Sequence, residues 1–342
     1  MTINLAHATA VQLTAAARAA AAAVTAQLPL AQYLPDRSNA TLSFEFSDNS
    51  ASIDTAEYRA YDTEAPYGNS EGKMTRSGKL PPLSRKRRVT EYDELMLNGR
   101  STTALYDKLV DHAEHLGRGI ALRLEFARAE AFRKGRLTLS ENGLRADINY
   151  GRKAERTVKL TGTARWGQSA AKPLEDLIKW SQLGVNDADT ITPTRLVMTA
   201  DVLEFLSKNA EIIGAALSRS DNLPGRISYD AVKSVLAQYG FITVTDVATL
   251  YAGFNVGAIL PAGTVLLLPQ PSINGLGGLG STDYGVPTEA LQPNYGISGP
   301  EQPGIFAGAF GRTDPEGLDV LGTAIALPVL TGANSTFAAE VF

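Results

Sequence analysis

The sequence predicts an α+β fold in which one long helix organises several short strands and a second, mixed lobe. Apolar residues recur at spacings of three and four from residue 101 to residue 134. Two alternating stretches flank Asn142-Gly143 directly afterwards, and short strand and helix patterns follow from about residue 165 to residue 310. The 342 residues are 44% hydrophobic and 20% charged, which is typical of a globular chain with a sizeable core.

The composition excludes several kinds of chemistry. The chain has no cysteine, which excludes disulfides, thiolate metal sites, iron–sulfur clusters and cysteine nucleophiles. Three histidines, His7, His112 and His115, leave little room for histidine catalysis. A formal net charge of -4 argues against bulk nucleic-acid binding. The N-terminus lacks a basic segment, so we expect no secretory signal.

The N-terminal region contains an alanine-rich run from Ala15 to Ala26. It includes Arg18 and is too short and too weakly apolar to span a membrane, whereas alanine strongly favours a helix. Because such a helix has few large side chains to bury, it is marginal alone. We expect an arm that docks on a neighbour, and the alternative is a frayed terminal helix.

The next stretch, from Leu34 to about Leu97, is polar and extended. Residues 41–46 alternate with period two and predict a strand. Residues 57–83 are rich in turn signals and poor in aliphatic side chains, so they predict a long projecting loop without a core of its own. A basic tetrad closes the stretch. It suggests nucleic-acid contact or a localisation signal, but acidic neighbours on both sides favour a solvated or intersubunit salt-bridging stretch.

The apolar stripe predicts a single helix over 101–134, which at 1.5 Å per residue is about 50 Å long. Gly117 and Gly119 interrupt it and mark either a bend or a close approach by another segment. His112 and His115 lie three residues apart on this helix; a metal site would need a third ligand, and none is evident, so an exposed helix face is favoured. The residues predicted to pack the helix are Leu109, Leu116, Ile120 and Leu124.

After the helix, Asn142-Gly143 supplies the positive φ angles of a tight turn and predicts a hairpin of strands 137–140 and 144–150. In the following lobe Asp201 is a candidate helix cap, and Ser228 is expected to cap a helix that ends at Gly240. The glycine- and proline-rich residues 273–304 are expected to form a loop. Further strands are expected at 157–160, 195–199, 241–244, 264–269, 318–330 and 337–342, and a further helix at 173–182.

Residues 275–280 match the pattern G-x-G-x-x-G of dinucleotide sites. Such a site needs a helix that opens at the motif, so that the helix N-terminus holds the pyrophosphate, and Ser281 to Pro287 are not helical in pattern. No Walker-type phosphate loop, G-x-S-x-G elbow or H-E-x-x-H motif occurs. We therefore expect no catalytic residue, no cofactor and no metal.

The order of these parts resembles the Hong Kong 97-type fold, and the sequence is similar to the lambda-type major capsid proteins of tailed phages, the phage capsid protein E family. The similarity covers about residues 34–342. The stretches that carry it are residues 57–66 and 78–86, residues 132–180 with Tyr150-Gly151-Arg152 and Trp166, and the C-terminal stretches Asp314-Pro315-Glu316-Gly317 and Ala326-Leu327-Pro328-Val329-Leu330.

The resemblance implies five parts: an N-terminal arm (1–49), an extended E-loop (50–100), a peripheral domain with the spine helix and hairpin (101–166), an axial domain (167–310), and a C-terminal β segment that returns to the peripheral domain (311–342). In this family the E-loop lies over the neighbouring subunit. The residues that would make those intersubunit contacts are Glu57, Arg59, Glu64, Lys79, Arg85, Lys86, Arg87 and Arg88.

The resemblance also implies a major capsid protein that self-assembles into hexamers and pentamers of an icosahedral head. The implied partners are other copies of the chain, a decoration protein docked on the arm and E-loop, a separate scaffolding protein and a portal. The shell would enclose double-stranded DNA without binding it specifically, without a membrane, in a virion assembled in the bacterial host cytoplasm. Lys73 and Lys79 lie in the loop, but nothing identifies a crosslinking partner.

Two other functions are open at this point. A nanocompartment shell similar to encapsulins shares the fold and packages enzymes. An enzyme would need an α/β ligand site within residues 165–310.

Overall fold

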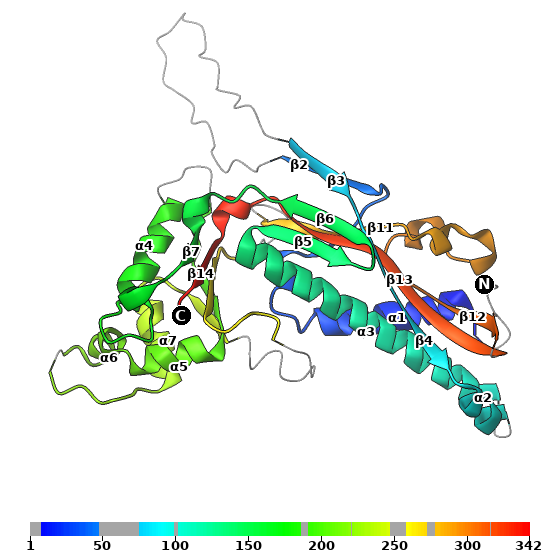
Figure 1. Ribbon diagram of the computed structural model, residues 1–342, viewed down its shortest axis with the longest axis horizontal. Helices are drawn as coiled ribbons and strands as arrows, with labels where there is room; N and C mark the ends of the chain where they lie inside the picture. Colours follow the sequence, from blue (N-terminus) through cyan, green and yellow to red (C-terminus); the bar gives the residue numbers. More distant parts are fainter. Residues whose placement is uncertain are drawn as a thin grey trace, which may run out of the picture.

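The structure is a computed structural model and describes residues 8–47, 75–98, 102–185, 191–219, 221–246, 258–271, 278–314 and 316–342. The molecule is elongated, with a helical lobe at one end and the short helix α2 (Glu91–Asn98) at the other (Figure 1). In the described ranges, no helix is both long enough and apolar enough to cross a membrane.

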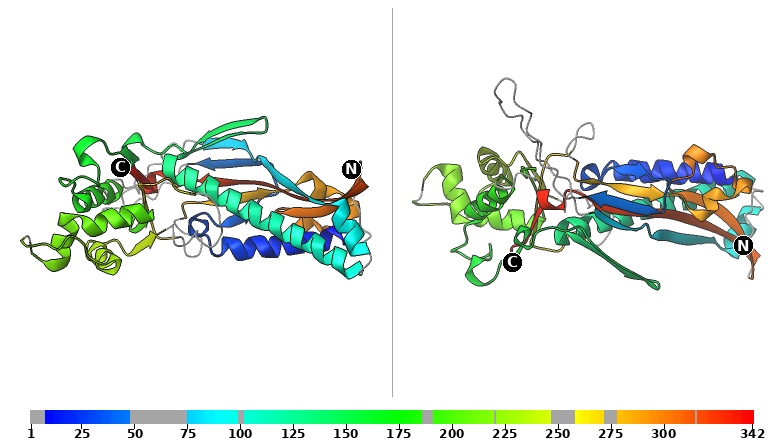
Figure 2. Two further views of the ribbon diagram at one scale, coloured as in Figure 1. Left: turned by 60° about the horizontal axis from the view of Figure 1, so that its bottom comes forward. Right: turned by 90° about the horizontal axis from the view of Figure 1, so that it is seen from above.

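The predicted long helix is α3, Thr102–Lys134, and it runs along the body (Figure 2). Its apolar stripe faces inward, since Leu109, Leu116, Ile120 and Leu124 are all at most 4% exposed. The helix ends at Gly135, whose φ of 63° is a left-handed conformation that favours glycine. The Arg152 guanidinium donates hydrogen bonds to the carbonyl oxygens of Phe132 and Arg133, which lack partners inside the helix.

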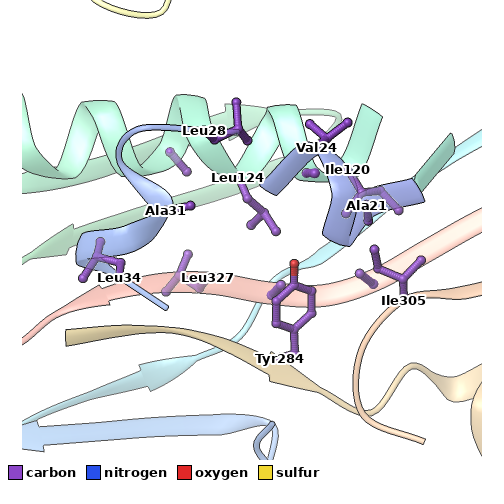
Figure 3. Close-up of a cluster of buried hydrophobic side chains, with 14 of the residues drawn as sticks. Ala21, Val24, Leu28, Ala31, Leu34, Ile120, Leu124, Tyr284, Ile305 and Leu327 are labelled. Carbon is purple, nitrogen blue, oxygen red and sulfur yellow. The ribbon is translucent and has the colours of Figure 1, made fainter. Parts of the chain in front are cut away.

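A five-stranded sheet forms the body beneath α3. Its central strand is the long β13 (Glu316–Leu330), which pairs with β4 (Pro82–Val89) along one edge and with β12 (Phe306–Thr313) and β11 (Gly280–Gly285) along the other. The short strand β1 (Asp36–Ser38) pairs in parallel with β11. Helix α1 (Ala10–Thr25) packs beside α3, and the core fills the space between these helices and the sheet (Figure 3).

A second five-stranded sheet belongs to the lobe, in the order β7-β14-β10-β8-β9. Its core contains a stack of Trp166, Trp180 and Phe337, with ring centroids 5.8 Å and 5.0 Å apart. The elements are β7 (Thr157–Lys159), α4 (Pro173–Val185), β8 (Arg195–Met198), α5 (Ala200–Lys208), α6 (Ala210–Leu217), α7 (Tyr229–Gln238), β9 (Thr243–Asp246), β10 (Thr264–Leu268) and β14 (Phe337–Glu340).

Two separate ribbons complete the fold. Strands β5 (Arg136–Glu141) and β6 (Leu144–Asn149) form the predicted hairpin, with φ of 47° at Asn142 and 84° at Gly143. Strands β2 (Ser43–Ser47) and β3 (Thr75–Lys79) form the other ribbon, in which Ser47 pairs with Thr75. The ring of Phe44 packs on the face of Gly78, where a Cβ would lie only 2.5 Å away.

The alanine-rich helix is not frayed, because α1 packs on α3 of its own chain. Leu13, Ala17, Ala21 and Val24 are buried there. Thr9 caps the helix in a reciprocal capping box with Gln12. Small side chains are what this position requires, since they let two helix backbones lie very close together.

The expectation of a loop over residues 273–304 is wrong for the part that the structure describes as β11. The strand was missed because its sequence, Gly280 to Gly285, is polar. Its polar groups are buried with partners: Thr282 Oγ1 donates to the carbonyl oxygen of Leu34 and accepts a hydrogen bond from Arg128. Strands β11 and β12 thus lie in the body sheet, so the expected axial domain of 167–310 includes strands that belong with α3. The C-terminal segment divides between the sheets, because β14 pairs in the lobe.

The expected E-loop of 50–100 also contains part of the body. Residues 82–89 form β4, which pairs with β13 along its whole length, and Leu80 is buried. Leu83, Arg87 and Val89 occupy alternate positions of this strand and are less exposed than the residues next to them, a pattern that the consecutive cations concealed. Asp201 is not a helix cap either: it lies inside α5 and accepts a hydrogen bond from the backbone N–H of Gly263 at 2.7 Å.

Candidate assembly surface

The predicted contact residues fall into two groups. Glu57, Arg59 and Glu64 lie outside the described residues. Lys79 lies on β3, and the basic tetrad lies together on β4, where the side chains of Arg85, Lys86 and Arg88 are exposed and that of Arg87 is half-buried. Strand β4 pairs with β13 on one side and with no other described strand, so it is an edge strand of the body sheet.

The two sides of β4 differ in their surroundings. Arg88 points toward Asp319 of β13, with 3.8 Å between Nε and Oδ1, and Asp319 also accepts a hydrogen bond from Arg312 at 3.0 Å. Arg85 and Arg87 line a groove of about 660 Å³ between β4, α3 and the tip of the hairpin. The walls of this groove are Leu83, Ser84, Arg85, Lys86, Arg87, His115, Leu116, Gly119, Ile120, Arg123, Glu141 and Asn142.

The positive charge of β4 acts on both histidines of α3. His112 is only 3% exposed, so the expectation of an exposed face is wrong for it, and its Nδ1 is a buried atom without a hydrogen-bond partner. Burial and the cations Arg87 and Lys108 lower the pKa of His112, against the opposing charges of Asp111 and Asp93. The pKa of His115 is also lowered, first by partial burial and then by the charge of Arg87, although its side chain is largely exposed.

The described residues give little support to the other chemistries considered. They include no group of three or more histidine and acidic residues that could hold a metal ion. Gly280, the last glycine of the dinucleotide-like motif, lies in β11, and a Cβ there would meet the carbonyl oxygen of Val329 at 1.9 Å. Because the motif leads into a strand and not into a helix, it lacks the helix N-terminus that would bind a pyrophosphate.

A surface that sequence reasoning missed lies on α2, at the end of the molecule opposite to the lobe (Figure 1). Tyr92 is 70% exposed and Leu95 is 69% exposed, with Met96 beside them. Large exposed apolar side chains grouped on one short helix are typical of protein interaction surfaces. The signal in the sequence was the apolar run from Leu95 to Leu97, which follows three acidic residues.

A model of the family described as phage major capsid protein E matches residues 9–341. The chain belongs to this family. Its fold is the Hong Kong 97-type capsid fold, and its role is that of a phage capsid shell protein, located in the shell of the virion. The family is a structural one and not a family of enzymes. No curated protein matches the sequence.

Two solved structures show the same fold at low identity. A phage-related protein from Bordetella bronchiseptica RB50 aligns at 15% identity with a TM-score of 0.59, covering 94% of this chain and 95% of that one. The putative capsid protein of a prophage of Escherichia coli CFT073 aligns at 13% identity with a TM-score of 0.57, covering 92% of this chain and 93% of that one.

Proposed function

We propose that this capsid protein assembles into hexamers and pentamers that close into an icosahedral head around double-stranded DNA. The observation that carries the proposal is the match of the model for phage major capsid protein E to residues 9–341. The exposed apolar residues of α2 support it, as does the edge of β4 that no other described strand pairs with, because both are surfaces that a partner would cover.

In this proposal the body with α3, the hairpin and the β13 sheet is the peripheral domain, and the lobe of α4–α7 is the axial domain that packs around the capsomer axis. The E-loop lies over a neighbouring subunit and makes contacts through Glu57, Arg59, Glu64 and Lys79. The tetrad Arg85–Arg88 makes intersubunit contacts from β4. Obligate interfaces of this kind bury on the order of 2,000 Å² or more.

The proposed partners follow from the resemblance to the lambda-type proteins. They are a decoration protein, a separate scaffolding protein and a portal, with assembly in the bacterial host cytoplasm. The N-terminal arm and the E-loop are the proposed docking surface for the decoration protein. The net charge of -4 is consistent with a shell that encloses DNA without binding specific DNA sequences.

Electron microscopy of the expressed protein, alone and together with its neighbouring head genes, tests this function. We expect closed shells with hexameric and pentameric units, and DNA-filled heads in the phage. Shells that carry an enzyme cargo instead of DNA would favour a nanocompartment. A discrete small oligomer that never closes into a shell would contradict the assembly proposal.

A further inference from the structure

The groove beside β4 combines a strand edge, a strongly positive wall and an apolar floor. Of the residues that line it, Arg85, Lys86, Arg87 and Arg123 are cations, and His115 can become one. Glu141 is the only carboxylate among these lining residues, and it is paired with Arg123 at 2.8 Å. The lining therefore holds no acidic partner for Arg85 or Arg87.

The floor of the groove is apolar. Leu116 and Ile120 of α3 are nearly buried, at 3% and 4% exposure, and Leu83 of β4 lies half-buried against the same core. Gly119 adds open space, since a Cβ there would meet nothing within 4 Å. A phosphate chain needs cations but gains nothing from this floor, whereas a polypeptide with alternating charged and apolar side chains uses both.

The backbone of β4 runs along one wall of the groove and sets the direction in which a bound strand would lie. An edge strand presents backbone donors and acceptors that an added strand can pair with. A second copy of β4 is a poor occupant, because it would set four cations against four cations. The same cations attract an acidic strand, and each charge-assisted hydrogen bond from arginine to carboxylate is stronger than a neutral one.

We propose that this groove binds an extended acidic segment of a partner protein, which adds to β4 as an antiparallel strand. Leu83, Arg85 and Arg87 alternate and so share one face of β4. The matching segment reads acid-x-acid-x-apolar, with its carboxylates opposite Arg87 and Arg85 and its apolar side chain opposite Leu83. The proposal concerns the unassembled chain and does not depend on shell formation.

The test uses the full-length chain, kept unassembled at low concentration, and a fluorescent synthetic peptide with the sequence Thr-Glu-Thr-Glu-Thr-Val-Thr. We expect saturable binding that weakens with added salt. The double variant Arg85→Glu/Arg87→Glu should weaken it about 10- to 100-fold, by reversing the charges that face the peptide. The control Lys179→Glu/Arg219→Glu makes the same charge change on exposed lobe residues and should leave binding unchanged. If the double variant fails to fold, Arg85→Gln gives a smaller loss by the same contact.

Hydrogen exchange supplies the readout of strand addition. Bound peptide should protect backbone amides of residues 83–87 and leave those of the lobe unchanged. Three results overturn the proposal: no saturable binding, an equal loss in the lobe control, or equally tight binding of a single-stranded oligonucleotide of the same charge, which would make the groove a general polyanion surface.

Discussion

Gly117 of α3 lies directly against the backbone of Ala17 in α1, so close that a Cβ at residue 117 would stand 2.1 Å from the Ala17 carbonyl oxygen. This close approach lets α1 pack on α3 of its own chain. Gly119, two residues further along the same helix, faces open space. The two glycines have the same helix propensity and opposite surroundings.

Replacing Gly117 by alanine should therefore destabilise the chain by about 1–3 kcal/mol, because the added methyl group forces α1 and α3 apart. Gly119→Ala should stabilise it by about 0.5–1 kcal/mol, since alanine loses less backbone entropy in a helix. Denaturant unfolding of the unassembled chain measures both. Equal effects of the two substitutions would show that the α1–α3 contact does not constrain residue 117.

The buried pair Glu125–Arg128 joins α3 to the segment that enters the sheet. Both side chains are at most 1% exposed, and their charged atoms are 3.4 Å apart. Glu125 also accepts a hydrogen bond from the Leu30 backbone at 2.9 Å, and Arg128 reaches Asp36 at 2.7 Å. Arg128→Met should cost about 3–5 kcal/mol, because it removes the buried cation that lies against Glu125 and Asp36.

The matched control for this substitution is Arg118→Met on the same helix. Arg118 forms an exposed pair with Glu114 at 2.8 Å, and such pairs contribute about 0.3–0.5 kcal/mol. Urea unfolding should separate the two variants clearly. A similar small effect for both would contradict a stabilising role of the buried Glu125–Arg128 pair.

Acid should weaken the packing of α2 and β4 on α3 through His112. Its folded pKa is depressed, first by burial and then by Arg87 and Lys108, so the unfolded chain binds the proton more readily. Its contribution to stability is complete above the unfolded value of 6.5 and is lost as pH falls through the lower folded value. Thermal unfolding between about pH 7.5 and pH 5 should show a falling midpoint.

His112→Gln should flatten this pH dependence, whereas His115→Gln, on the exposed face three residues later, should retain most of it. The comparison uses the slope of the midpoint against pH, so a constant loss of stability in either variant does not disturb it. The idea fails if the slope stays unchanged in His112→Gln.

The E-loop should be separable from folding. Because Ser47 and Thr75 are paired, an Asn-Gly turn in place of residues 48–74 can join β2 to β3 and leaves buried Leu80 in place. We expect this variant to unfold as cooperatively as the parent but to form no shells by electron microscopy. A Gly/Ser segment of the original length should also fail to assemble, since the contact residues are gone. Normal shells from either variant would refute the assigned role of the loop.

How far the sequence predicts the structure differs from element to element. The stripe of α3 and the Asn142-Gly143 turn were predicted correctly because both depend on local rules, a helical period and a pair of positive φ angles. The cap at Ser228 was correct for the same reason, since its hydroxyl accepts the backbone N–H of Ala231 within one turn.

The errors share one physical cause, which is contact between segments distant in the chain. By its sequence alone, β11 is predicted as a polar loop. It is a strand whose buried Thr282 hydroxyl forms hydrogen bonds with Leu34 and Arg128. Strand β4 is likewise predicted as a charged loop, and its pairing with β13 makes it a strand. Likewise, His112 is buried, and the charges that act on it include Arg87 of β4 and Asp93 of α2. For the candidate site, the sequence supplied the four cations, and the structure supplied the groove in which two of them face an apolar floor.

The sequence by itself determined the class of fold, the long helix and the hairpin, and by resemblance it determined the capsid family. These features depend on periodicity, turn residues and family motifs, which are local properties of the sequence. Only the tertiary structure decided that the alanine-rich helix packs on α3 of its own chain, that β11 and β12 join the body sheet, and that the basic tetrad lies on an edge strand. Those outcomes depend on close packing and on partners for buried polar groups, which arise only when distant segments meet.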